Sequence, residues 1–225
     1  MECSMTKTNM NKFRLFMTLC ILIISLVSNC IAQDLDSRDQ ERENKYKDSL
    51  AMEIAGLKKG MFVGEVGAGD GYFTFMLANQ VGSEGRVYAN DLFEKGALEV
   101  IRARAREKNI ENIITILGTV ETPKLPKGQL DMVFIVNAFH DFTEPVEMLS
   151  NIAPALKPSG KLVIIDSEAE KSRGISKSRI YNRQDLQEWV NQSPFTIELI
   201  DDKSLPKRGT YPNVIRVLSL KKKSE

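Results

Sequence analysis

The residues best placed to do chemistry are three glycines and two carboxylates in the first half of the chain. Gly67, Gly69 and Gly71 follow a short apolar run, and Glu65 stands two residues before the first of them. Asp91 closes a second such run, twenty residues after Gly71. Glycines let a ligand approach the backbone closely, and a carboxylate at a strand end accepts hydrogen bonds from both hydroxyls of a ribose. These residue types and spacings predict a site for a ribose-containing ligand.

The spacing of the glycines differs from the G-x-G-x-x-G fingerprint of dinucleotide-binding enzymes. In that fingerprint the third glycine would stand at Tyr72, whereas here it stands at Gly71. Glu65 would also repel a pyrophosphate, but it suits a ligand with a cationic ammonium or sulfonium group. A nicotinamide-dependent oxidoreductase on a similar sheet therefore remains the weaker alternative.

The elements that must position these residues alternate between strands and helices. Apolar runs, several of them β-branched, predict strands at residues 61–66, 86–91, 113–117, 130–136, 161–166, 195–200 and 214–220. Helical spacing and turn signals predict helices at residues 50–59, 72–80, 94–108, 145–156 and 184–191, and a turn at residues 158–160. Near-continuous apolar strands separated by helices indicate an α/β fold with a parallel sheet covered on both faces. Such sheets bind their ligands at the carboxyl edge, where the glycines lie.

Composition excludes several other classes of protein. The chain has 225 residues with 31 Lys+Arg and 30 Asp+Glu, so its net charge of +1 gives no reason to expect nucleic-acid binding. Cys3, Cys20 and Cys30 all lie within the first thirty residues, which excludes disulfides, thiolate zinc sites and a cysteine nucleophile from the rest. His140 is the only histidine, so a histidine-based metal cluster is excluded as well, and we expect no metal.

The N-terminal segment is typical of an export signal. Basic residues precede an uncharged run at residues 15–27, and Ala32 before Gln33 suits a cleavage site. We expect residues 1–32 to be a signal peptide, residues 33–47 a polar lead-in and residues 48–225 the folded domain, exported to the periplasm or secreted. An uncleaved membrane anchor and a lipid-modified Cys30 remain open alternatives, and they are the only membrane contacts we expect.

Four segments resemble class I S-adenosylmethionine-dependent methyltransferases. Residues 63–71 (VGEVGAGDG) resemble the first motif of that family, and residues 85–91 (GRVYAND) its second strand with the ribose-binding acid. Residues 130–137 (LDMVFIVN) are similar to its fourth strand, and residues 156–162 (LKPSGKL) to the turn into its fifth. The resemblance runs in order over residues 57–220. It implies a Rossmann-like, doubly wound seven-stranded sheet, mostly parallel with a C-terminal antiparallel hairpin, and S-adenosylmethionine as cofactor.

The resemblance also implies cofactor-binding roles, position by position. Gly67, Ala68, Gly69 and Gly71 would form the floor under the methionine part of the cofactor, and Glu65 would act on its amino end from below. Asp91 would hold the ribose and Leu92 would lie against the adenine. Thr119 and Val120 fall in the loop that lines the adenine, although the family often has Asp where Thr119 stands. Asn137 would reach the cofactor from the end of the fourth strand.

The acceptor side of the site carries weaker signals. His140 follows the fourth strand and is a candidate general base, with an orienting hydrogen-bond donor and a plain loop residue as alternatives. The aromatic residues Phe139, Phe142, Tyr72 and Tyr181 are candidates for the wall of an acceptor pocket, although such residues also serve as core. Residues 172–181 and 205–212 are expected to shape this pocket.

The mechanism that the resemblance implies is direct transfer of a methyl group to a small-molecule acceptor. The acceptor attacks an already activated methyl group, so the protein mainly supplies alignment and desolvation. No metal or nucleophilic residue is required, and the missing thiols exclude an arsenic-methylating enzyme that relies on its own cysteines. An exported, non-catalytic module that binds S-adenosylmethionine or another nucleoside remains the main alternative.

Overall fold

The computed structural model describes residues 7–167, 183–201 and 215–223. The chain divides into two compact units, residues 1–44 and residues 45–225. The helix α1 (Lys7–Tyr46) forms the described part of the first unit and ends at the second residue of the next unit, so the polar lead-in expected at residues 33–47 is helical up to Tyr46. Across the described residues, none of the helices combines the length and the apolar character needed to cross a membrane.

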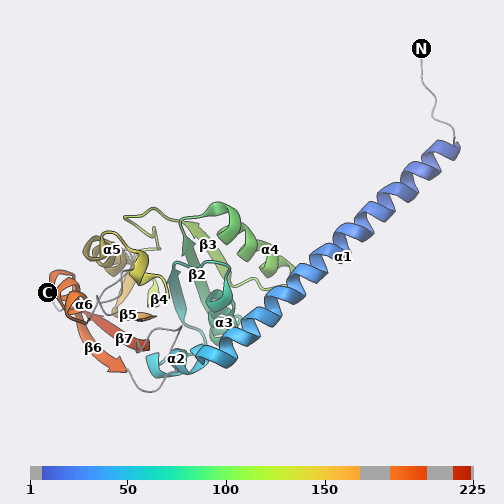
Figure 1. The fold of residues 1–225 in the computed structure, drawn as a ribbon. Helices are drawn as coiled ribbons and strands as arrows, with labels where there is room; N and C mark the ends of the chain where they lie inside the picture. Colours follow the sequence, from blue (N-terminus) through green and yellow to red (C-terminus); the bar gives the residue numbers. More distant parts are fainter. Residues whose placement is uncertain (1–6, 168–182, 202–214, 224–225) are drawn as a thin grey trace, which may run out of the picture. The chain divides into compact units, whose positions relative to one another are not determined.

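The second unit is built on a sheet of seven strands in the order β3-β2-β1-β4-β5-β7-β6 (Figure 1). The strands are β1 (Phe62–Val66), β2 (Arg86–Asp91), β3 (Ile113–Leu117), β4 (Leu130–Val136), β5 (Leu156–Ser167), β6 (Phe195–Asp201) and β7 (Ile215–Lys222). The first five pair in parallel, whereas β7 pairs antiparallel with both β5 and β6. The expected mixed seven-stranded sheet with an antiparallel C-terminal hairpin is therefore confirmed.

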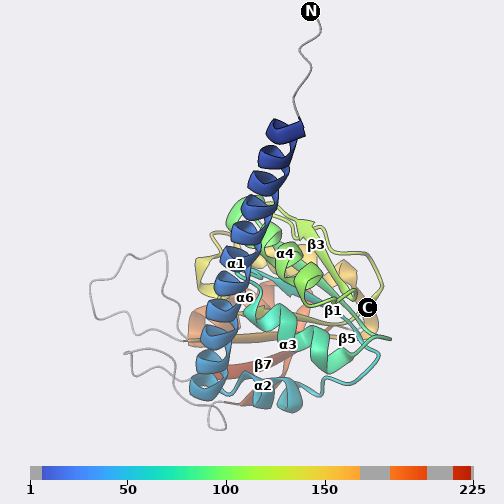
Figure 2. The same ribbon diagram turned by 90° about the vertical axis from the view of Figure 1, so that its right-hand side faces the viewer.

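Helices cover both faces of this sheet. They are α2 (Asp48–Ala55), α3 (Tyr72–Val81), α4 (Glu99–Glu107), α5 (Pro145–Ile152) and α6 (Arg183–Gln192). Helices α3 and α4 lie on one face and α5 and α6 on the other, as Figures 1 and 2 both show. Two large apolar clusters result. One joins Phe73 and Leu77 of α3 to Phe134 of β4, and the other joins Leu149 of α5 and Val190 of α6 to the opposite face.

The structure differs from the expected helix at residues 94–108, which is kinked. Its first turn, η1 (Glu94–Leu98), contains an extended Lys95 and a left-handed Gly96 with φ 87°, and regular helix begins only at Glu99. Glycine adopts positive φ at little cost, so it lets the chain turn sharply here. The helix expected at residues 145–156 also ends early, at Ile152, and is followed by a single 3₁₀ turn, η3 (Ala153–Ala155).

The prediction of a turn at residues 158–160 was wrong. Those residues lie inside β5, where the pairing with β4 shifts register between Leu130↔Leu156 and Met132↔Lys161. Four residues of β5 therefore oppose Asp131, which is an irregularity of the strand rather than a separate turn. Lys157 uses this bend to reach Asp131, with Nζ 2.6 Å from Oδ1.

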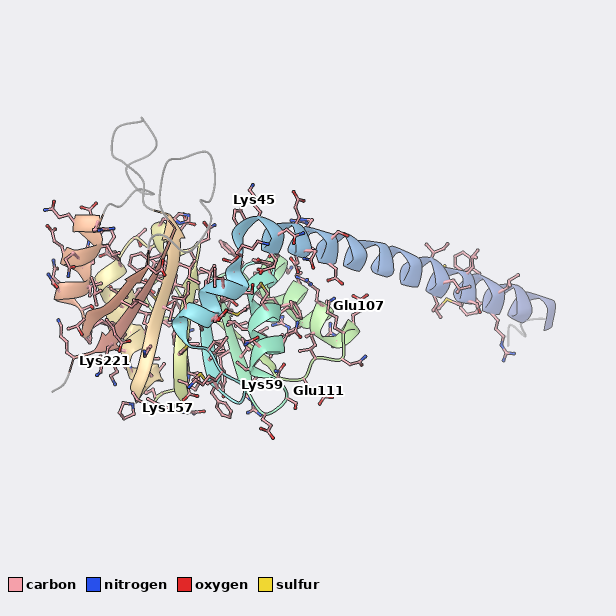
Figure 3. The ribbon with its side chains drawn as sticks, turned by 90° about the horizontal axis from the view of Figure 1, so that it is seen from below. Lys45, Lys59, Glu107, Glu111, Lys157 and Lys221 are labelled. Atoms are coloured by element: carbon pink, nitrogen blue, oxygen red, sulfur yellow. The ribbon has the colours of Figure 1, made fainter. Side chains whose placement is uncertain are left out.

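The parallel strands begin at one edge of the sheet and end at the opposite edge, and these two edges differ chemically. Charged residues gather where the parallel strands begin, and Figure 3 shows Lys59, Lys157 and Lys221 along this edge. The opposite, carboxyl edge carries the glycine-rich turn between β1 and α3, together with the ends of β2 and β4. The candidate site lies at this second edge.

Candidate functional site

The glycine loop between β1 and α3 uses its three glycines in two different ways. All three have positive φ, at 82° for Gly67, 55° for Gly69 and 87° for Gly71. A Cβ atom on Gly67 would come within 2.5 Å of the Cβ of Ala138, and one on Gly71 within 2.8 Å of the Cγ1 of Ile101. A Cβ atom on Gly69 would meet nothing within 4 Å. Gly67 and Gly71 are therefore required for packing, whereas Gly69 keeps open the space above the loop.

Asp91 ties this loop to the end of β2. Its Oδ2 accepts a hydrogen bond from the backbone N–H of Gly69 at 2.9 Å, and its Oδ1 accepts one from the N–H of Phe93 at 3.0 Å. The carbonyl oxygen of Asn90 accepts two more bonds, from the N–H groups of Gly67 and Ala68. The loop is thus fixed by β2 on one side, and the Asp91 carboxylate is aimed across it.

Glu65 lies in β1 beneath the loop and is fully buried. The pKa of its carboxyl group is raised to about 8, chiefly because the charged form loses its hydration on burial and also because the carboxylates of Asp91 and Asp70 lie nearby. A hydrogen bond from the hydroxyl of Thr74 acts in the opposite direction. The carboxyl group is therefore poised to ionise when positive charge arrives close by.

A cavity of about 560 Å³ opens above the loop. Seven of the predicted site residues line it: Gly67, Gly69, Asp91, Leu92, Thr119, Val120 and Asn137. The predicted residues Glu65, Ala68, Gly71 and His140 are not part of this lining. The first three are buried under or within the loop, so any role for them in binding is one of support.

Part of the cavity lining is apolar and accessible to solvent. Leu92 is 43% exposed and Val120 is 58% exposed, although both line the cavity. The adjoining loop is held by its own turn, in which the N–H of Thr119 donates to the carbonyl of Thr122 and the N–H of Thr122 to the Thr119 hydroxyl. The side chains of Leu92 and Val120 offer apolar surface that the flat ring of a base can cover.

Several lining residues were missed by the sequence analysis. Lys95 and Gly96 reach the cavity because of the kink in η1, and Asp141 because the chain makes a short turn, η2 (Phe139–Asp141), after β4. The glycine at position 96, inside an expected helix, was the signal for the first of these. Asp141 carried no signal in the sequence beyond its place after a strand.

Of the three described aromatic residues considered for an acceptor wall, only Phe142 lines the cavity. Phe139 is buried, with its ring 6.1 Å from that of Trp189 in α6, and so belongs to the core. Tyr72 is also buried, and its hydroxyl donates to Asp48 at 3.0 Å. Tyr181, with the segments 172–181 and 205–212, lies outside the described residues.

His140 stands in η2, next to the cavity, and its imidazole is held by Asp166. The Nδ1 atom lies 2.9 Å from Oδ1 of Asp166, and the backbone N–H of His140 donates to Oδ2 of the same carboxylate at 3.0 Å. Asp166 was not among the predicted site residues. It ends the apolar run of β5 as Asp91 ends that of β2, and this strand-end acid is the signal that marks it.

Comparison with known proteins finds, over most of the second unit, the family that the sequence motifs resemble. The family model described as "Methyltransferase domain" matches residues 57–206. The demethylmenaquinone methyltransferase of Lactococcus lactis subsp. lactis is 27% identical over 167 residues, which are 73% of this chain and 62% of that protein. The ubiquinone/menaquinone biosynthesis C-methyltransferase UbiE of Shewanella baltica is 28% identical over 124 residues, 55% of this chain and 49% of that protein. The chain thus spans between about half and 62% of these relatives.

Solved structures share the fold at low sequence identity. A SAM-dependent methyltransferase from Aquifex aeolicus has a TM-score of 0.69 and 21% identity, covering 84% of this chain and 97% of that one. The geranyl diphosphate C-methyltransferase from Streptomyces coelicolor A3(2), solved with S-adenosyl-L-homocysteine, has a TM-score of 0.65 and 15% identity, covering 79% and 77%. The same arrangement of strands and helices is therefore found in proteins of this class.

Proposed function

This chain belongs to the methyltransferase-domain family of class I S-adenosylmethionine-dependent methyltransferases, and we propose that it transfers a methyl group from that cofactor to a small-molecule acceptor. One observation carries the proposal. The open face of Gly69, the Asp91 carboxylate and the apolar pair Leu92 and Val120 line one cavity at the carboxyl edge of the sheet.

The donor set of this cavity fits the nucleoside part of the cofactor. A carboxylate has about four acceptor positions, and Asp91 uses two of them for the N–H groups of Gly69 and Phe93. The remaining positions suit the two hydroxyls of a ribose. Leu92 and Val120 supply apolar surface for the adenine, and Asn137 reaches the cavity from the end of β4.

The methionine part of the cofactor fits the loop above Glu65. A side chain at Gly69 would occupy the space that this part needs, and none is present. The cofactor brings a positive sulfonium and, at neutral pH, a positive ammonium group. Approach of these charges favours the ionised form of Glu65. We propose that Glu65 acts through the loop, since it does not line the cavity.

When bound, the cofactor supplies a methyl group that is activated by the positive sulfur. The contribution of the chain is then to hold the nucleoside by Asp91 and the loop, to align an acceptor from the side of Asp141 and Phe142, and to exclude water. The small-molecule class of acceptor is supported by the cavity volume of about 560 Å³, which is in the range of small-molecule sites. It is also supported by the names of two similar proteins, a demethylmenaquinone methyltransferase and a geranyl diphosphate C-methyltransferase.

The two alternatives are disfavoured on separate grounds. A nicotinamide dinucleotide would place its pyrophosphate above the buried Glu65, where the protonated carboxyl offers no positive charge to attract the anion and the ionised carboxylate would repel it. A non-catalytic module needs room for the nucleoside alone. The cavity extends to Asp141, Phe142 and Thr143 beyond the residues assigned to the nucleoside, which supports a second ligand.

The proposal is tested by calorimetry and by a transfer assay on the full chain. S-adenosylhomocysteine should bind with one site per chain, and NAD should not. Labelled S-adenosylmethionine is then offered with 1,4-naphthohydroquinone, catechol, benzenethiol and N,N-dimethylaniline, and transfer to at least one of them is expected. Binding of NAD without binding of S-adenosylhomocysteine would contradict the proposal. Binding of S-adenosylhomocysteine with no transfer would favour the non-catalytic module.

We further propose that residues 1–32 direct export of the protein and are removed after Ala32. The basic residues that precede the uncharged run at 15–27, and the small residue at the proposed cleavage site, support this. Residues 33–46, which are helical, would then begin the mature chain.

A further inference from the structure

We propose that Asp166 is a positioning residue that holds His140 as the general base for the methyl acceptor. The inference rests on the proposed function and extends it, because it defines what kind of acceptor the site can use. It starts from the contacts between one half-buried imidazole and one carboxylate that is 1% exposed.

The sheet brings these two residues together although they are 26 positions apart in the chain. Strands β4 and β5 are parallel neighbours with Val136 opposite Ile165, so Asp166 comes at the same edge as the turn η2 that follows β4. The N–H of Asn137 donates to the carbonyl of Ile165 at 2.8 Å, which continues the ladder into this turn. The placement of His140 relative to Asp166 is therefore set by the register of the sheet.

Two bonds fix the orientation of the imidazole. The Nδ1 atom lies 2.9 Å from Oδ1 and 3.1 Å from Oδ2 of Asp166, and the backbone N–H of His140 donates to Oδ2 at 3.0 Å. A carboxylate only accepts hydrogen bonds, so Nδ1 must carry the proton that it donates. The neutral ring then has its lone pair on Nε2, as a general base requires.

The Nε2 atom lies on the side of the imidazole that is near Asp141. It is 3.6 Å from Oδ2 of Asp141, and Asp141 lines the cavity together with Ala138 and Phe142. Once Nε2 has taken up a proton, the imidazolium lies between the carboxylates of Asp166 and Asp141. Their opposite charges stabilise the ion formed in that step.

This arrangement selects acceptors that must lose a proton. The acceptor X–H gives its proton to Nε2 of His140, and the electron pair of X forms the new bond to the methyl carbon. The bond from methyl carbon to sulfur breaks, and its electron pair stays on the sulfur, which becomes neutral. The products are X–CH₃, the thioether of the cofactor and a protonated His140, which returns its proton to water. We therefore infer a hydroxyl-bearing acceptor, such as a phenol or hydroquinone, rather than a tertiary amine or thioether.

The positioning role can be measured without any acceptor, because His140 is the only histidine in the chain. The full chain, labelled with ¹⁵N-histidine and free of any histidine tag, gives one imidazole spin system, whose ¹⁵N shifts report which nitrogen carries the proton. We expect Nδ1–H with unprotonated Nε2 at a pH where the ring is neutral. In Asp166→Asn the side-chain amide can donate to Nδ1, and the tautomer should change to Nε2–H.

The matched control is Asp141→Asn, which alters the carboxylate on the other side of the ring and should leave the Nδ1–H tautomer in place. Binding of S-adenosylhomocysteine by Asp166→Asn should stay within about twofold of the unmodified chain. If the unmodified chain itself did not bind S-adenosylhomocysteine, that result would count against the proposed function instead. A tautomer in the unmodified chain with the proton on Nε2, or identical tautomers in the chain and Asp166→Asn, would overturn the positioning role.

The acceptor class is tested by transfer to 1,4-naphthohydroquinone as a function of pH. Asp166→Asn and His140→Ala should each slow transfer at least tenfold at neutral pH, and by less at the alkaline pH where the hydroxyl ionises unaided. If the variants lost activity for purely structural reasons, the loss of transfer rate would be equal at both pH values. That result would overturn the role of His140 as general base. Transfer to N,N-dimethylaniline but not to the hydroquinone would overturn the acceptor class.

Discussion

The carboxylate of Asp91 accepts a hydrogen bond from the backbone N–H of Gly69 at 2.9 Å. Gly69 belongs to the turn between β1 and α3 and Asp91 to the end of β2, and this bond joins the proposed ribose-binding acid to the open glycine. A change at either residue should therefore affect the same ligand, by different physical routes.

Asp91→Ala should weaken binding of S-adenosylhomocysteine at least tenfold, or about 1.4 kcal/mol. The variant loses the acceptor for the ribose hydroxyls and the bond that holds Gly69. Isothermal titration calorimetry measures the effect. Asp131→Asn is the matched control, because Asp131 also accepts a backbone N–H, that of Phe62, but lies at the opposite edge of the sheet. Equal affinities of Asp91→Ala and the control would remove Asp91 from the site.

Gly69→Ala should mainly weaken ligand binding, whereas Gly67→Ala should mainly lower thermal stability. Both place alanine at positive φ, which costs about 1–2 kcal/mol. The new methyl group at position 69 points into open space and should weaken binding of S-adenosylhomocysteine tenfold or more in a folded protein. At position 67 it would lie 2.5 Å from the Cβ of Ala138, so thermal unfolding should occur at a clearly lower temperature than for Gly69→Ala. Undiminished binding by Gly69→Ala would show that no ligand lies over this glycine.

Glu65 should make the free energy of unfolding fall as pH rises. The pKa of its carboxyl is raised from 4.5 to about 8 in the folded chain, so between these values the folded state holds a proton that the unfolded state releases. This stabilising contribution is complete below about pH 4.5 and is lost by about pH 8. At about 1.4 kcal/mol per pKa unit, the loss amounts to several kcal/mol.

Glu65→Gln removes that titration and can still accept the Thr74 hydroxyl bond. Relative to the unmodified chain, the variant should therefore gain stability between pH 5 and pH 9 in urea denaturation experiments. Glu107→Gln, at an exposed position in α4, is the control and should follow the unmodified chain throughout. A constant difference between Glu65→Gln and the unmodified chain across this range would show that the carboxyl ionises normally.

His140→Ala should separate binding from transfer. The imidazole is outside the cavity lining, so affinity for S-adenosylhomocysteine should change by less than about twofold. The transfer step should slow at least tenfold, within the range that a positioned base contributes. Single-turnover transfer of labelled methyl gives the rate directly. An unchanged rate would make His140 part of the scaffold.

Cleavage of the N-terminal segment has a simple readout. Expressed in a bacterium with an export pathway, the protein should be recovered from the periplasm or medium with a mass that corresponds to a start at Gln33. Ala32→Arg should block the processing, because the cleavage site needs a small residue there. Recovery of the full mass from the soluble cytoplasmic fraction would contradict the proposed export.

The parts of the site that sequence could predict are those encoded by neighbouring residues. A strand, three closely spaced glycines and a helix are local features, and so is an acid such as Asp91 at the end of an apolar run. The α/β class with a covered sheet also followed from the alternation of strands and helices, and the seven strands with an antiparallel hairpin followed from the resemblance to the methyltransferase family. For these reasons the cavity floor and the seven-stranded sheet could be anticipated.

The parts that could not be predicted depend on register and on packing between distant elements. Asp166 meets His140 only because β4 and β5 align Val136 with Ile165. Phe139 and Phe142 are three residues apart, yet packing against Trp189 of α6 draws the first into the core and leaves the second at the cavity. Neither relationship is visible in the local sequence.

We propose above all that Asp91 and the loop from Gly67 to Gly71 hold a sulfonium nucleoside at the carboxyl edge of this sheet. A crystal structure of the full chain with S-adenosylhomocysteine tests it most directly. We expect the ribose hydroxyls on the Asp91 carboxylate, the amino-acid end of the ligand over Gly69, and the adenine between Leu92 and Val120. Density for the nucleoside elsewhere, with the space above Gly69 filled by side chains of the protein, would contradict it.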